Sequence, residues 1–182
     1  DRIVLLLTDG LGYRLLNRFM ENDDALVEDV KAITEGRGIL PLTSTWPSTT
    51  AVALPTIWTG VPPAQHGMIA TIMYLRELSM LGNMLAYKPY TGLHREGVFA
   101  DWGMPGDQFV GVPGLAQRLL DVGVKTHLLL DKNLFVSGLS RILHRGVAET
   151  QPHAGISDVW LRLRDLLDQT RGKRCYVSAY LP

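Results

Sequence analysis

The sequence feature that most constrains the fold is a set of short apolar runs that end in polar residues. Residues 3–7 are entirely apolar and lead into a Thr-Asp-Gly turn. A short run without polar alternation is typical of a strand buried on both faces, as the strands of parallel sheets are. Residues 125–131 (KTHLLLD) and 175–181 (CYVSAYL) also contain apolar runs and predict two further strands.

Helical periodicity alternates with these runs. The segments with apolar residues at helical spacing are 11–19, 26–33, 115–120, 139–143 and 156–167. The first two are two helices or one interrupted helix, and Ser157 is the expected N-cap of the last. Residues 38–42 predict another strand. This alternation predicts an α/β fold with a mostly parallel sheet and helices on both faces.

Two regions are less sharply defined. Residues 68–87 fit either a helix that contains Gly82 or extended chain with short strands, and their four methionines are expected in the core. Residues 88–114 are rich in Pro, Gly and aromatic residues and predict a long ordered surface loop. Phe99, Trp102 and Phe109 either pack this loop or stack on a base or leaving group of a ligand.

Length and composition set broader limits. A chain of 182 residues is expected to form a single α/β domain, 1–182. Because it stops at Pro182, directly after a strand-like run, we expect it to be the N-terminal part of a larger catalytic domain. Eighteen basic residues offset eighteen acidic ones, so we expect no binding to duplex nucleic acid. The sole cysteine, Cys175, excludes an internal disulfide and predicts a small buried hydrophobe.

Membrane and targeting signals are also absent from the sequence. No apolar run reaches the roughly 20 residues that span a bilayer, so we expect no membrane insertion. The chain opens on Asp1 without a secretory n-region, h-region or cleavage site. The sequence leaves the location undetermined: a cytoplasmic location is favoured, and an extracytoplasmic one stays open if a signal has been removed.

Residues 42–67 are the richest in hydroxyl groups, and they alternate with proline and glycine. A hydroxyl at the start of a helix is well placed to meet phosphate, because the first turn offers unpaired N–H groups and a partial positive charge. Thr50 is the candidate for this hydroxyl. Pro55 removes a donor from a helix that begins at Thr50, so the helix is either kinked there or begins near Pro55.

Asp9 and Thr50 both follow predicted strands, and ligands of open α/β sheets bind beyond the carboxyl ends of strands. Taken alone, Asp9 fits an Asp-Gly turn and Thr50 fits a helix cap. Taken together, a carboxylate and a hydroxyl at a helix start are what a metal-activated phosphoryl acceptor needs.

The stretches IVLLLTDGLG and WPSTTAVALPTIWTGVPPAQHG resemble the type I phosphodiesterase/nucleotide pyrophosphatase family of the alkaline phosphatase superfamily. The Thr-Gly and His-Gly pairs that follow the nucleophile in this family match residues 59–60 and 66–67 without gaps. In this register the resemblance implies that Thr50 is the nucleophile and a metal ligand, and that Asp9 is a metal ligand. The stretch CYVSAYLP resembles the strand that precedes an Asp-x-x-x-His metal motif in the family.

The resemblance implies a hydrolase that uses two divalent metal ions, zinc being favoured, and forms a phosphothreonine on Thr50. The second metal's ligands are not in this sequence. The expected substrates are small phosphorylated compounds, with phosphodiester or pyrophosphate bonds of the nucleotide type. The family's phosphate-binding Asn is replaced by Thr71, a weaker substrate-binding candidate. A phosphomonoesterase or phosphonate hydrolase, and a non-catalytic phosphate- or metal-binding module, stay open, as does the oligomeric state.

The remaining titratable residues have structural explanations. We expect His66 to be structural, His127 to be a core or edge residue of a strand, and Asp131 to be a turn residue with a minor claim on the site. Solvated positions are expected for the other histidines, which are His94, His144 and His153.

Overall fold

The computed structural model describes residues 1–135 and 137–182, which form two compact units. Unit 1 comprises Asp1–Leu7 and Ser44–Leu181, and unit 2 comprises Thr8–Thr43 and Pro182. Each unit is described by itself. Among the described residues, no helix combines the length and the apolar character that crossing a membrane requires.

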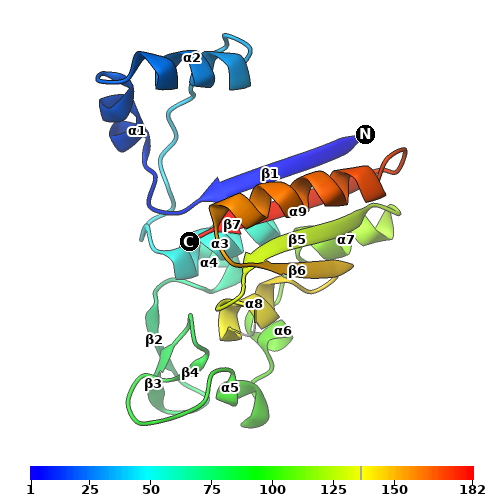
Figure 1. The fold of residues 1–182 in the computed structure, drawn as a ribbon. Coiled ribbons are helices and arrows are strands. Elements are labelled where there is room, and N and C mark those ends of the chain that lie inside the picture. The colour runs from blue at the N-terminus through cyan, green and yellow to red at the C-terminus, as the bar shows by residue number, and fades with distance from the viewer. Residues whose placement is uncertain (136) are drawn as a thin grey trace. The chain divides into compact units, whose positions relative to one another are not determined.

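Unit 1 contains a four-stranded sheet in the order β1-β7-β5-β6 (Figure 1). The strands are β1 (Arg2–Thr8), β5 (Lys125–Asp131), β6 (Glu149–His153) and β7 (Cys175–Leu181). Strand β5 pairs in parallel with β7 and with β6, so that Leu129 lies opposite Ala179 on one side and Gln151 on the other. Figure 1 shows β1 running in the same direction as β7. The predicted α/β fold with a parallel sheet is confirmed.

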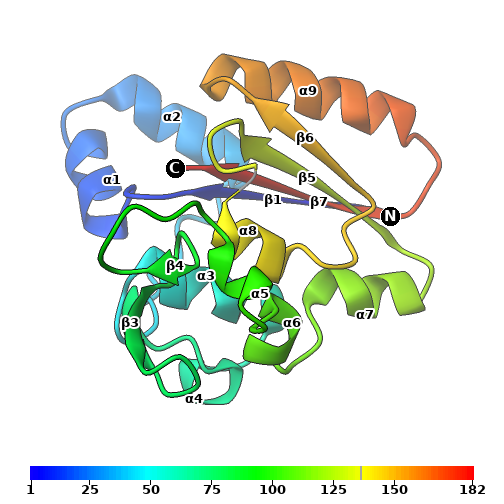
Figure 2. The same ribbon diagram turned by 90° about the horizontal axis from the view of Figure 1, so that it is seen from below.

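Helices cover both faces of this sheet (Figure 2). Helix α9 (Ile156–Gln169) lies on one face, and α3 (Thr50–Thr59), α7 (Leu115–Asp121) and α8 (Gly138–Leu143) lie on the other. Successive side chains of a strand point to opposite faces. Leu129 accordingly joins the core under α9, whereas Leu128 and Leu130 join the larger core on the other side.

Residues 68–109 fold as short elements of unit 1. Strands β2 (Ile72–Leu75), β3 (Met80–Asn83) and β4 (Lys88–Pro89) form an antiparallel sheet, so the extended interpretation of residues 68–87 is the correct one. Helix α4 (Pro63–His66) precedes this sheet, and α5 (Val98–Asp101) and α6 (Gly106–Phe109) follow it. The prediction of a surface loop over residues 88–114 is therefore wrong in part, because Phe99 is fully buried in the core.

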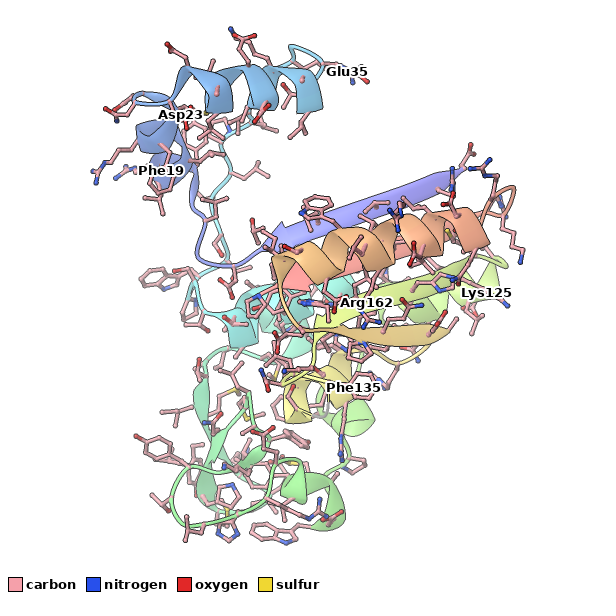
Figure 3. All side chains as sticks on the ribbon, viewed as in Figure 1. Phe19, Asp23, Glu35, Lys125, Phe135 and Arg162 are labelled. Carbon is pink, nitrogen blue, oxygen red and sulfur yellow. The ribbon has the colours of Figure 1, made fainter. Side chains whose placement is uncertain are left out.

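Unit 2 contains two helices, α1 (Tyr13–Met20) and α2 (Asp24–Ile33). Of the two alternatives from the sequence, two separate helices are therefore correct and one interrupted helix is wrong. Figure 3 shows Phe19 on α1 and Asp23 at the turn into α2. The Asp23 side chain caps α2 by accepting from the N–H of Leu26 at 3.0 Å. The strand predicted at residues 38–42 is wrong, since these residues have no regular structure. Pro41 lacks the N–H that a ladder needs, which works against a strand here.

Three boundaries also differ from the sequence interpretation. Helix α3 begins at Thr50 with Pro55 inside it, so the alternative start near Pro55 is wrong. The N-cap of α9 is Gly155 rather than Ser157. Strand β6 was not predicted, because a five-residue segment that contains Pro152 does not have the apolar pattern of a buried strand.

Close packing between α8 and the segment that joins β3 to β4 depends on Gly138. A Cβ atom at Gly138 would lie 2.3 Å from Cβ of Tyr87 and 2.5 Å from the carbonyl oxygen of Ala86. We predict that Gly138→Ala lowers the free energy of unfolding by about 1–3 kcal/mol, since backbone and a Cβ atom cannot move aside cheaply. Urea denaturation measures this. Gly111→Ala is the matched control, because no atom lies within 4 Å of the added Cβ, and equal effects of the two changes would contradict this packing.

Candidate functional site

Thr50 is the first residue of α3, and Thr49 is the N-cap in an extended conformation. The N–H groups of Val52 and Ala53 both donate to the Thr49 carbonyl, at 2.9 and 2.8 Å. The side chain of Thr50 is half-buried. Its hydroxyl therefore belongs to the first turn of a ten-residue helix, where the helix dipole favours negative charge.

The neighbouring Thr49 hydroxyl is buried and has no hydrogen-bond partner among the described residues. Its side chain does not cap α3, although threonine is a common capping residue. An unsatisfied buried hydroxyl costs free energy, and water or a ligand oxygen would satisfy it. The start of α3 thus has an unmet polar group next to the candidate nucleophile.

Contacts at the other end hold α3 in place within unit 1. Gly60 ends the helix in the left-handed conformation at φ 71°, and the Arg118 guanidinium of α7 donates to the Thr59 carbonyl at 2.6 Å. An arginine at a helix C-terminus pairs with carbonyl groups that have no intrahelical partner. This bond ties the C-terminal end of α3 to α7.

His66 joins α3 to the segment that follows α4, and it is almost fully buried. Its Nδ1 accepts from the N–H of Met68 at 3.1 Å, so its Nε2 bears the proton and donates to Oγ1 of Thr56 at 2.9 Å. The Thr56 hydroxyl in turn donates to the carbonyl of Val52 at 3.2 Å. Burial lowers the pKa of His66, which favours this neutral form. The structural role expected for His66 is confirmed.

Asp9 belongs to unit 2 and directly follows β1. Its Oδ1 accepts from the N–H of Gly10 at 2.8 Å, and Gly10 has φ +74°, in the region that favours glycine. The Asp-Gly turn weighed from the sequence is therefore present. Because Thr50 belongs to unit 1, joint metal binding by Asp9 and Thr50 stays a prediction.

Thr71, the third candidate, lies immediately before β2 and is half-buried. Its carbonyl accepts from the N–H of Met84 at 2.8 Å, which extends the β2–β3 ladder at its open end. This contact fixes the backbone of Thr71. Substrate binding by its hydroxyl stays a prediction.

A cavity of about 610 Å³ lies against the β2–β3 hairpin of unit 1. Trp102 and Phe109 line it, whereas Phe99 packs in the core beneath. The Trp102 ring meets those of Phe99 and His94 edge-on, with centroids 5.9 and 5.5 Å apart. The packing role is confirmed for Phe99, and stacking of Trp102 or Phe109 on a ligand stays a prediction. Phe99 packs the loop, and Trp102 and Phe109 face a space of ligand size.

Two of the histidines expected to be solvated are not. His153 is 2% exposed, and its Nε2 donates to the carbonyl of Tyr180 at 2.9 Å. The end of β6 therefore lies against the interior of the sheet. His144 is half-buried and its ring lies 4.9 Å from that of Trp58.

His127 lies near Glu149, with Nδ1 3.3 Å from Oε2. Oδ1 of Asp131 accepts from the N–H of Asn133, as a turn residue does.

The predicted metal ligands are of a suitable donor type. Asp9 and Thr50 offer a carboxylate and a hydroxyl, which suit a divalent cation, but zinc sites have four ligands. Among the described residues, no three His, Cys, Asp or Glu side chains gather into a group that could hold a metal ion.

Comparison with known families identifies the class. Residues 3–104 match the family model described as type I phosphodiesterase/nucleotide pyrophosphatase. This match covers more than half of the 182 residues, so the chain belongs to this family. No curated protein sequence gives a match.

Solved structures show the same fold. Phosphonoacetate hydrolase from Sinorhizobium meliloti 1021 in complex with phosphonoacetate matches with a TM-score of 0.61 and 18% identity. The complex of that enzyme with phosphonoformate matches with a TM-score of 0.62 and 18% identity. Both matches cover 98% of this chain and 46% of the other, so this chain spans about half the length of those proteins. The fold is therefore alkaline-phosphatase-like.

The environment of His144 predicts how stability depends on pH. Burial lowers the pKa of His144 from 6.5 to about 4, so between these values the unfolded chain binds a proton that the folded chain does not. Stability is then greatest above pH 6.5 and falls as the pH falls. We predict that proton uptake by His144 in the unfolded chain lowers the free energy of unfolding by up to about 2 kcal/mol when the pH falls from 7 to 5.

Urea denaturation at both pH values measures this loss. His144→Gln, which cannot take up a proton, should lose less stability over the same interval. An unchanged loss in His144→Gln would contradict the assignment to His144.

Proposed function

We propose that the protein is a metal-dependent phosphoesterase that hydrolyses phosphodiester or pyrophosphate bonds of small nucleotide-type substrates. The observation that carries the proposal is the position of Thr50, the first residue of α3, within the segment that matches the family model. The orphaned Thr49 hydroxyl beside it supports an oxygen-rich ligand at the same helix start.

In the proposed mechanism, the Thr50 oxygen attacks phosphorus in line with the leaving group. A bond forms between Oγ1 of Thr50 and phosphorus, and the bond from phosphorus to the leaving oxygen breaks. Water then attacks the phosphothreonine and releases the phosphoryl or nucleotidyl group, which restores the hydroxyl. The N-terminal turn of α3 stabilises negative charge on the phosphoryl oxygens throughout.

Asp9 and Thr50 are the residues of this chain that we propose as metal ligands. A bound divalent cation, zinc being favoured by the family, would lower the pKa of the Thr50 hydroxyl and offset the charge on phosphate. The family resemblance implies a second ion whose ligands are not in this sequence. We therefore propose that the chain is the N-terminal part of a larger catalytic domain.

A second candidate is a phosphomonoesterase or phosphonate hydrolase. Two observations favour it. Thr71 stands where the family has a phosphate-binding Asn, and the matched solved structures are phosphonoacetate hydrolase with phosphonoacetate and phosphonoformate. Comparing turnover of an aryl phosphodiester, an aryl phosphomonoester and phosphonoacetate separates the two candidates. If the aryl phosphodiester is turned over fastest, the phosphodiesterase proposal is supported. If the phosphomonoester or phosphonoacetate is turned over fastest, the second candidate is supported.

The third candidate is a non-catalytic binding module. It is supported by the observation that no three His, Cys, Asp or Glu side chains among the described residues form a group that could hold a metal ion. A binding module would turn over neither the aryl phosphodiester, nor the aryl phosphomonoester, nor phosphonoacetate, whereas either enzyme would turn over at least one of them. Metal analysis adds an independent criterion, since such a module should hold one weakly bound ion at most.

Loss of the nucleophile tests the mechanism. We predict that Thr50→Ala, in the protein at its native length with zinc, lowers turnover of an aryl phosphodiester about 10³-fold or more, because the change removes the oxygen that would bond to phosphorus. Thr50→Ser should retain part of the activity. Ser48→Ala, in the same hydroxyl-rich stretch, is the control and should leave turnover unchanged. Full activity of Thr50→Ala would show that Thr50 is not the nucleophile.

A further inference from the structure

Helices α5, α6 and α8 of unit 1 meet around a cavity of about 150 Å³ that contains no residue of the proposed catalytic site (Figure 2). Tyr87, Ala100 and Ile142 give this cavity apolar walls, and three glycines complete the walls with backbone. Two arginines, Arg141 and Arg145, also line it. Among the described residues, no acidic side chain belongs to the lining. The cavity therefore combines a small apolar space with positive charge.

Close backbone contacts fix the walls of this cavity. A Cβ atom at Gly106 of α6 would lie 2.3 Å from Cγ1 of Ile142 on α8, and Gly138 makes the equally close approach to Tyr87 described above. Elements that already touch through backbone cannot move much closer together, so the space between them does not collapse. The cavity is therefore a fixed feature of the packing around α8.

Tyr87, one of the lining residues, has a strained backbone. Its φ of 52° lies in the left-handed region, where a bulky side chain is an outlier. Its hydroxyl donates to the carbonyl of Met104 at 2.7 Å, and its own carbonyl accepts from the N–H of Phe99 at 3.3 Å. These contacts hold the residue in this conformation. Because strain that the surroundings maintain is concentrated at functional sites, the backbone of Tyr87 supports a functional role for the cavity.

Arg145 is half-buried and follows α8 directly in the chain. Its Nε donates to the carbonyl of Ile142 at 3.2 Å, and its Nη2 donates to the carbonyl of Val110 at 3.1 Å. These bonds fix the guanidinium in place, but both acceptors are neutral. A guanidinium has five N–H donors, so three of them are not used by these two bonds. Arg145 therefore brings an oriented positive charge to the cavity.

Arg141 is the second cation of the cavity. Its Nη1 lies 3.5 Å from the position of a Cβ atom at Gly97, the N-cap of α5. Its guanidinium makes no hydrogen bond or ion pair with a described residue, whereas Asp101 of α5 pairs with Arg95. Two cations that line the same small space repel each other, and a bound anion would relieve this repulsion.

We propose that this cavity binds a small organic carboxylate. The planar guanidinium groups of Arg141 and Arg145 match the two oxygens of a carboxylate, and Tyr87, Ala100 and Ile142 contact its short apolar stem. Phosphate fits less well, since its oxygens need hydrogen-bond donors on every side and these walls are largely carbon. The cavity has room for about five water-sized groups, which corresponds to a carboxylate with a stem of about two carbon atoms, as in propionate.

Equilibrium dialysis of the native-length protein against radiolabelled propionate tests this proposal without reference to catalysis, so it can fail independently of the proposed function. We expect saturable binding at one site per chain. Propionamide has the same shape without the charge, and inorganic phosphate has the charge without the stem, so each should compete at least about 10-fold less well than unlabelled propionate. Absence of saturable binding, or equal competition by propionamide or phosphate, would overturn the proposal.

Matched variants locate the site. Arg141→Gln should weaken propionate binding at least about 10-fold without a change in the urea unfolding curve, because this exposed side chain makes no contact that stabilises the fold. Ala100→Leu fills the cavity without changing the charge and should have the same effect on binding. Arg164→Gln removes an exposed arginine from α9 and is the control, with affinity unchanged. Affinity in Arg141→Gln or in Ala100→Leu equal to that in Arg164→Gln would overturn the assignment to this cavity.

Discussion

The parallel pairing of β5 with β7 and β6 is the interaction on which the rest of the structure depends. It places Leu128, Leu129 and Leu130 at the centre of a sheet that is covered on both faces. Leu129 packs under α9, and its two neighbours pack against the core that contains α3, α7 and α8. Burial of this strand therefore holds both helical layers, including the helix that begins with Thr50.

Contacts along α3 hold the helix whose first residue is Thr50. Arg118 fixes the C-terminal end of α3 through the Thr59 carbonyl, and His66 fixes its middle through Thr56. A helix held at these two places presents its first turn in a defined position. Preorganised N–H groups and a fixed nucleophile are what phosphoryl transfer requires of a protein.

Much of the fold follows from the sequence, because apolar runs and helical periodicity report local burial directly. Strands β5 and β7 match their predicted residues, and the helices at 13–33 and 156–169 follow their apolar spacing. Strand β6 could not be predicted, since its pairing with β5 is a tertiary contact that the polar sequence around Pro152 does not reveal. The burial of His144 and His153 depends on Trp58 and Tyr180, which are distant in sequence.

The candidate site shows the same division. The motif spacing that identifies Thr50 is local, and the start of α3 at this residue agrees with it. The aromatic cavity beside the hairpin was only partly foreseen, because burial of Phe99 separates it from Trp102 and Phe109. The second metal site that the resemblance implies stays a prediction, since no ligand group for it gathers among the described residues.

The central claim is that Thr50 forms a covalent bond to phosphorus. Rapid acid quench of the native-length protein during turnover of an aryl phosphodiester, followed by peptide mass spectrometry, tests it most directly. The account predicts a phosphoryl-type adduct on the peptide that contains Thr50, located on Thr50 by fragmentation. An adduct on another residue, or turnover with no adduct under conditions that trap phosphothreonine, would contradict it.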